Sequence, residues 1–124
     1  MFLYLEALFI GLYVLIIYII IKLLSIPFPF FIELFIIGFI KHFIGYYGGL
    51  QNFYCKYKYN VNINYNNIIY QCILEGLAFI LLGYIIKTIF INKYLIYFIL
   101  GFLIHIISEI VGIHYLFCNY NIIK

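Results

Sequence analysis

The segment GFIKHFIGYYGGLQNFYCKY, residues 38–57, places two lysines, a histidine, four glycines and a cysteine inside a chain that is otherwise strongly apolar. A second segment, GFLIHIISEIVGIHYLFCNY at residues 101–120, matches it at seven of twenty positions with an offset of 63. The matches include two of the three histidines and two of the three cysteines, which chance seldom aligns even in a biased composition. The sequence therefore predicts an internal repeat.

The composition around this repeat is that of an integral membrane protein. Of the 124 residues, 69% are hydrophobic and only 9% are charged, and the mean hydropathy is +1.18. Crossing a hydrocarbon core of about 30 Å takes roughly 20 helical residues. Four segments are long enough: residues 2–24, 30–54, 68–91 and 94–117. We expect an all-α integral membrane protein forming a single domain, residues 1–124.

The repeat predicts how these four spans are organised. The first two-helix repeat covers residues 1–57 and the second covers residues 68–120. Their first spans match more loosely, through LEAL (5–8) with LEGL (74–77) and through Lys22 with Lys87. Because each repeat contains two spans, both copies have the same orientation in the membrane. The two halves are thus expected to be related by a pseudo-two-fold axis along the membrane normal.

The segment that joins the two repeats, residues 58–67, is rich in tyrosine and asparagine. In CKYKYNVNINYNN, residues 55–67, polar and apolar residues alternate, which is the pattern of an extended chain. An unpaired strand inside lipid would leave its backbone groups unsatisfied. We therefore expect a short extended linker at the membrane interface.

Small residues and histidines share one face of each second span. Small residues four positions apart let two helices approach closely in lipid, where van der Waals contact must hold them together. We therefore predict that the spans at 30–54 and 94–117 pack against each other through a helix-packing seam, which carries both histidines to the protein interior near mid-bilayer. The seam consists of Gly38, Gly45, Gly49, Gly101, Ser108 and Gly112, with His42 and His105 on the same faces.

Two interpretations of His42 and His105 stay open. In the first, they have a chemical role: they bind a metal or a haem, or they relay protons together with Glu109, which lies one turn after His105. In the second, each makes an interhelical hydrogen bond that fixes packing. No H-E-x-x-H or C-x-x-C motif completes a ligand set. The metal is therefore unknown, and no cofactor is expected.

Two further polar residues are candidates inside the membrane. Lys41 lies near mid-span and has no counterpart, since Ile104 occupies the matching position. Its side chain either extends to the interface or pairs with a carboxylate. His114 lies near the end of the fourth span. Glu6 and Glu75 lie near helix starts, where a carboxylate complements the helix dipole and reaches headgroups.

The cysteines lie at one predicted membrane face. Cys55 and Cys118 occupy matched helix ends, so they are candidates for a disulfide if that face is oxidising. If it is reducing, three thiols, including that of Cys72, together with His114 form an alternative metal set. A third interpretation is that all three are buried or boundary-lying thiols without a special role.

These observations favour a structural or assembly protein that self-associates or anchors partners in the lipid bilayer. The alternatives are an ion, proton or small-solute path at the repeat interface, lined by His42, His105 and Glu109, and a haem- or metal-binding redox protein. No catalytic constellation is recognised, so an enzyme is not expected. The lysines are scattered, which excludes a nucleic-acid surface.

The amino-acid usage also bears on the origin of the chain. The sequence contains no Asp, Arg or Trp, while Ile, Phe, Tyr, Asn and Lys are abundant. AU-rich codons produce this bias, so an AT-rich genome is expected, such as that of a parasite, an organelle or a large DNA virus. A multi-pass protein of a viral or host internal membrane fits this composition.

Overall fold

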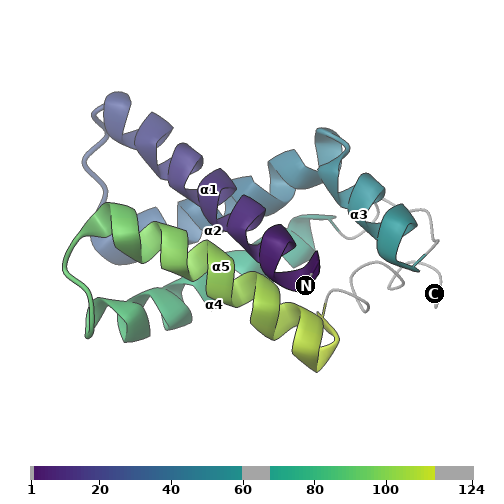
Figure 1. The fold of residues 1–124 in the computed structure, drawn as a ribbon. Helices are drawn as coiled ribbons and strands as arrows, with labels where there is room; N and C mark the ends of the chain where they lie inside the picture. The colour runs from purple at the N-terminus through teal and green to yellow at the C-terminus, as the bar shows by residue number, and fades with distance from the viewer. Residues whose placement is uncertain (1, 60–67, 114–124) are drawn as a thin grey trace.

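A computed structural model describes residues 2–59 and 68–113, and they form five α-helices (Figure 1). No strand occurs within these described ranges, which confirms the all-α expectation. Lys58 and Tyr59 are helical rather than extended, and the rest of the predicted linker lies outside the described residues. The helices are α1 (Phe2–Leu23), α2 (Phe30–Tyr47), α3 (Leu50–Tyr59), α4 (Ile68–Lys87) and α5 (Lys93–Val111).

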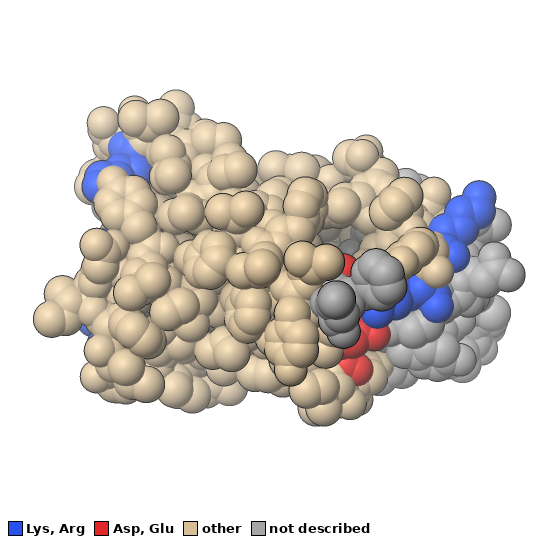
Figure 2. All heavy atoms as spheres, in the orientation of Figure 1, with Lys and Arg blue, Asp and Glu red and all other residues tan. Residues whose placement is uncertain are grey.

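Four of these helices, α1, α2, α4 and α5, are long and apolar enough to cross a membrane. At 1.5 Å per residue their lengths are roughly 27–33 Å, which matches the hydrocarbon core. On the face drawn in Figure 2, lysines lie at both ends of the molecule, glutamates at one end, and the band between carries neither. The four helices and this band fit a multi-pass membrane protein.

The connections at the far end from α3 have local causes. Pro29 directly precedes α2 and has an extended backbone. A proline is tolerated at the start of a helix but not in its interior, so Pro29 marks where α2 begins. Asn92 caps α5, and its side-chain oxygen accepts hydrogen bonds from the backbone N–H groups of Tyr94 and Leu95. These two loops make α1–α2 and α4–α5 consecutive membrane hairpins (Figure 1).

The predicted second span, residues 30–54, is wrong in one respect, because it is two helices. α2 ends at Tyr47, and α3 begins at Leu50. Between them Gly49 has a φ of +87°, a left-handed conformation that favours glycine. α3 lies at the end of the bundle that also holds the N-terminus (Figure 1). The composition changes at this break, because α2 is strongly apolar whereas α3 contains Gln51, Asn52, Lys56 and Lys58.

The other predicted ends differ less. α4 ends at Lys87 rather than at residue 91. α5 ends at Val111 rather than at residue 117, and Gly112 follows with a φ of +84°. A glycine in this conformation is a common way to end a helix.

The helix pairing also corrects an expectation. α1 packs along α5, and α2 packs along α4, whereas the predicted packing of α2 against α5 is not one of the main contacts. Each close approach is made by one glycine on each helix. A Cβ on Gly38 would lie 2.9 Å from the Glu75 carbonyl oxygen, and one on Gly101 would lie 2.9 Å from the Ile10 carbonyl oxygen. Their partner glycines are Gly76 and Gly11, each with its Cα 3.0 Å from the added Cβ.

Apolar and aromatic side chains fill the bundle away from α3. The ring of Tyr18 stacks on that of Tyr97 with 4.5 Å between centroids, and Phe79 and Leu34 are fully buried in the same cluster. The Tyr97 hydroxyl donates a hydrogen bond to the buried Glu33 carboxylate at 2.7 Å. The other buried polar side chains of the described residues, His42, Gln71, His105 and Ser108, lie toward the α3 end.

Candidate ligand cavity and histidine cluster

An open cavity of about 340 Å³ lies between α1, α2, α3 and α5 at the α3 end. Its apolar wall comes mainly from α1 and α3, through Leu5, Phe9, Ile10, Leu50 and Phe53. Its polar groups come from three spans, through Glu6, Tyr13, Lys41, His42 and His105. Ligand sites in proteins are typically of this size and combine an apolar lining with a few polar groups.

Both predicted histidines reach this cavity, but through different helix pairs. His42 Nε2 lies 3.1 Å from the Gln71 side-chain oxygen on α4. His105 Nε2 lies 3.2 Å from Glu6 Oε1 on α1. Both imidazoles are buried, with 4% of each side chain exposed. Each histidine thus joins its own helix to the neighbour along which that helix packs.

Lys41 pairs with a carboxylate inside the bundle. Its ammonium nitrogen lies 2.8 Å from Glu75 Oε2, and the two side chains are only 11% and 10% exposed. The Tyr13 hydroxyl donates a hydrogen bond to the Lys41 carbonyl oxygen at 2.8 Å. The sequence left two interpretations of Lys41, extension to the membrane interface or pairing with a carboxylate, and the structure shows the pairing. Glu75 does not reach headgroups, because it faces Lys41 across the α2–α4 contact.

A polar network continues from this ion pair toward the α3 end. Glu75 Oε1 lies 3.7 Å from His42 Nδ1, on the opposite side of the ring from Gln71. The Tyr46 hydroxyl donates a hydrogen bond to the same Gln71 oxygen. Sequence reasoning missed Gln71 and Tyr46, because a single amide or tyrosine in an apolar span carries no spacing signal.

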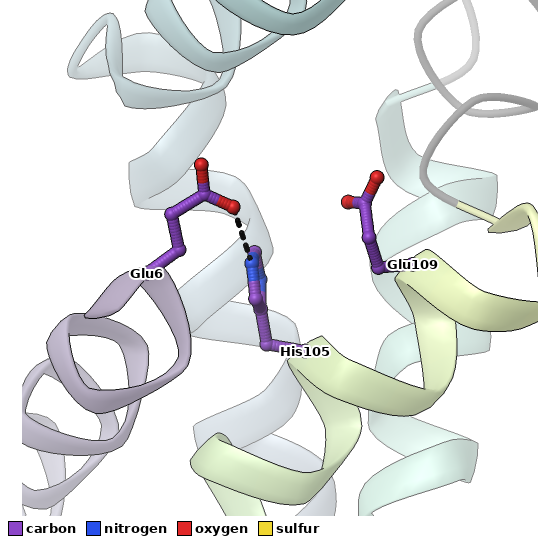
Figure 3. Close-up of side chains that lie close together, drawn as sticks. All are labelled: Glu6, His105 and Glu109. Carbon is purple, nitrogen blue, oxygen red and sulfur yellow. Dashed lines mark hydrogen bonds and ion pairs between the residues drawn. The ribbon is translucent and has the colours of Figure 1, made fainter. Parts of the chain in front are cut away.

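The second histidine belongs to a cluster with two carboxylates. The ligand atoms of Glu6, His105 and Glu109 all lie within 4.8 Å of one another. In Figure 3 a hydrogen bond joins the Glu6 carboxylate on α1 to the His105 ring, and the Glu109 carboxylate stands on the other side of the ring, one turn further along α5. Sequence reasoning proposed His105 with Glu109, but it missed Glu6, which is 99 positions away from His105.

α3 supplies three further contacts to this cluster, from two residues. The Tyr54 hydroxyl donates a hydrogen bond to Glu109, and the Tyr54 ring lies edge-on to His105 with 5.6 Å between centroids. Lys58 Nζ lies 3.5 Å from Glu6 Oε1. The short helix thus covers the cavity and holds the cluster from the boundary side.

The residues of the predicted seam are divided among different roles. Gly38 and Gly101 are the close-approach positions, and Ser108 is buried on α5. A Cβ on Gly45, Gly49 or Gly112 would meet no atom within 4 Å. Gly45 lines the cavity, Gly49 lies in the break between α2 and α3, and Gly112 caps the end of α5. The predicted seam is therefore two glycine contacts in two different helix pairs.

The cysteines are described in part. Cys55 is disulfide-bonded, and Cys72 is a buried free thiol. Cys118 and His114 lie outside the described residues, so the pairing of Cys55 with Cys118 stays a prediction. Because the Cys55 thiol is oxidised, it cannot belong to the alternative set of three thiols.

Comparisons with protein-family models, with curated proteins and with solved structures find no match for this chain. The class that the fold supports is a small multi-pass membrane protein with four apolar helices. Any more specific function has to be argued from the cavity and its residues.

Proposed function

We propose that this membrane protein binds the polar head of a membrane amphiphile in the cavity at its α3 end. The observation that carries the proposal is that His42, His105 and Lys41, from two spans, converge with Glu6 on one open cavity. Ionisable groups inside a membrane protein are expensive to bury and are usually functional when they line a cavity.

The rim of the cavity favours entry from lipid rather than from water. Four lining residues expose more than half of their surface: Leu5 and Phe9 on α1, and Phe53 and Tyr57 on α3. All four are apolar or aromatic, as is typical of side chains at the membrane boundary. A volume of about 340 Å³ equals that of roughly ten water molecules at ~30 Å³ each. It accommodates a head group, while the chains stay in the bilayer along α1 and α3.

The charges around the cavity favour a neutral or zwitterionic head. Among the described residues at this end, the three carboxylates Glu6, Glu75 and Glu109 are balanced by three lysines, Lys41, Lys58 and the exposed Lys56 of α3. The balance with neutral histidines is zero. Lys41 is already paired with Glu75, so its charge is compensated before a ligand binds. An anionic head would therefore meet no excess of positive charge.

Gly45 offers a direct test. It lines the cavity, and a Cβ there meets nothing within 4 Å, so Gly45→Leu fills the cavity without a clash at the helix contacts. Ile44→Phe adds bulk at the neighbouring lipid-exposed position and is the matched control. Native mass spectrometry of protein from nanodiscs of mixed phosphatidylethanolamine, phosphatidylcholine and phosphatidylglycerol measures the bound lipid.

Wild type and Ile44→Phe are expected to retain one zwitterionic lipid, and Gly45→Leu is expected to lose it. Equal lipid retention in all three proteins would contradict the proposal, because the retained lipid would then be annular. A preference for phosphatidylglycerol would contradict the assignment of the head group.

A structural or assembly role is the second candidate, and the interhelical pairs favour it. Each buried histidine and Lys41 contacts a polar side chain on the neighbouring helix. In this case the polar groups serve packing, and the protein acts through self-association or partner anchoring. Sedimentation of the wild type in detergent tests self-association, and a monomer that retains a lipid would favour the first candidate.

The described residues do not favour the transport alternative. Beyond the cavity, Tyr18, Tyr97 and Phe79 pack in the apolar core between the spans. A path across the bundle would have to open this cluster. The cavity is thus proposed as a binding site with one entrance.

We also propose that the two halves arose by duplication around a pseudo-two-fold axis. In support, the contact of α1 with α5 in one half corresponds to the contact of α4 with α2 in the other. Each of these two helix pairs has one glycine contact and one hydrogen bond of a histidine. The facing glycines match Gly11 with Gly76, the same offset as Lys22 with Lys87. This register aligns Glu6 with Gln71, one helical turn from the LEAL–LEGL alignment.

A further inference from the structure

We propose that Glu6, His105 and Glu109 bind one divalent transition-metal cation. This site goes beyond the proposed lipid binding, and metal content can be measured whether or not a lipid is present. The three ligand atoms lie within 4.8 Å of one another, and they come from two helices that are packed along each other.

The first two ligands already have the required spacing. His105 Nε2 and Glu6 Oε1 are 3.2 Å apart. A zinc-like ion about 2.0–2.1 Å from each atom would subtend an angle of roughly 100° between them, which lies between the octahedral and tetrahedral values. These two residues need no backbone movement. Glu109 has to move its flexible carboxylate about 1.5 Å closer, from 4.8 Å, since two ligands about 100–110° apart around such an ion are separated by roughly 3.2–3.4 Å.

The surroundings support binding with an accessible position. His105 is buried, and its ring and the Glu6 carboxylate both line the cavity. A three-residue protein set with one position open to a cavity is typical of metal sites that also bind water or a ligand. Tyr54 donates a hydrogen bond to Glu109, which orients this carboxylate.

Metal binding here replaces protons and one weak ion pair. Without metal, His105 Nε2–H donates to Glu6 Oε1, and Lys58 lies 3.5 Å from the same oxygen. To bind the ion, the imidazole moves its proton to Nδ1 or releases it, and Nε2 offers its lone pair. Lys58, with 23% of its side chain exposed, withdraws toward the boundary. Neither change requires an oxidant or reductant.

The donor set indicates the class of metal. One imidazole nitrogen and two carboxylate oxygens suit Zn²⁺, Mn²⁺, Fe²⁺ and Co²⁺. The two carboxylates also compensate the charge of a divalent ion at a depth where an unpaired charge would be costly. Co²⁺ is a convenient probe, because its visible absorption reports its coordination directly.

The chain itself provides a conservative variant. Glu6→Gln would reproduce at His105 the histidine–glutamine bond that His42 makes with Gln71, so the α1–α5 contact is expected to survive. Glu109→Gln keeps an oxygen for the Tyr54 hydroxyl. His42→Asn, which alters the other histidine of the same cavity, is the matched control.

The experiment is titration of detergent-purified full-length protein with Co²⁺, followed by Zn²⁺ competition and metal analysis after dialysis. Wild type and His42→Asn are expected to bind one ion per chain. Glu6→Gln and Glu109→Gln are expected to bind it at least tenfold more weakly while keeping the wild-type Tm without metal. Absence of stoichiometric metal in the wild type, or equal binding by all four proteins, would overturn the proposal.

Discussion

Lys41 shows how a single residue that looks misplaced in the sequence finds its explanation in the fold. It has no counterpart in the second half, and its ion-pair partner Glu75 has no matching carboxylate in the register set by the facing glycines. Ile104 matches Lys41, and Ile10 takes the place of Glu75 beside the facing glycine. One helix pair thus carries an ion pair where the other carries two isoleucines.

This difference predicts an asymmetric response to mutation. Lys41→Ile alone leaves the Glu75 carboxylate buried without its main partner, which costs about 3–5 kcal/mol. The double variant Lys41→Ile with Glu75→Ile is expected to recover most of this loss, because two apolar groups replace both charges. Unfolding in a graded detergent mixture measures both changes, and a double variant less stable than Lys41→Ile would contradict the pairing.

At the same scale, the sequence predicted which polar residues are buried inside the bundle, but it did not predict their hydrogen-bond partners. His42 and His105 are buried at one cavity, as expected of histidines in spans. Their partners, Gln71 and Glu6, were not predicted, because each lies on a helix far away in sequence. Periodicity tells which face a residue occupies, and it does not tell which helix covers that face.

At the scale of the helices, two glycines set the pairing. Gly38 and Gly101 bring α2 to α4 and α5 to α1. The sequence predicted packing through small residues but assigned it to α2 with α5, because both segments carry small residues four apart, Gly45 with Gly49 and Ser108 with Gly112. The actual partners, Gly76 and Gly11, are single glycines without such spacing.

Replacing glycines on one face of α2 is therefore predicted to have opposite effects on stability. Gly38→Leu forces a side chain against the α4 backbone and is expected to lower the free energy of unfolding by about 1–3 kcal/mol. Gly45→Leu, seven residues later, meets open space and gains helix propensity, so stability should be unchanged or slightly higher. Thermal unfolding of both variants in one detergent checks the difference. Equal losses would show that Gly45 is also a packing position.

The break between α2 and α3 makes a separate prediction. Gly49 has a φ of +87°, so Gly49→Ala is expected to cost roughly 1–2 kcal/mol, whereas Gly45→Ala in the α2 helix should not destabilise. Because α3 covers the cavity, Gly49→Ala should also weaken lipid retention in native mass spectrometry. Full stability of Gly49→Ala would contradict a left-handed residue at this break.

At the scale of the whole molecule, composition alone predicted four spans and an all-helical fold. It did not predict the separate α3 helix or the cavity, because both depend on a two-glycine break and on which helices pair. The pseudo-two-fold arrangement stays a prediction, supported by the two matching sets of contacts.

The topology of the four spans predicts that α3 and the α4–α5 loop lie on opposite sides of the membrane. Lys56→Cys on α3 and Ile91→Cys in the loop are both exposed. Each should react with a membrane-impermeant maleimide from one side only, and the two sides should differ. Labelling of both from the same side would contradict the arrangement of four crossing helices.

The most direct test of the ligand cavity is to map where a photoactivatable lipid attaches. A zwitterionic lipid with a diazirine near the head group should crosslink to Phe9 and Phe53 at the rim, and Gly45→Leu should abolish these products while Ile44→Phe keeps them. Crosslinks spread over lipid-facing residues such as Leu23 and Leu81, and unaffected by Gly45→Leu, would contradict a lipid site in this cavity.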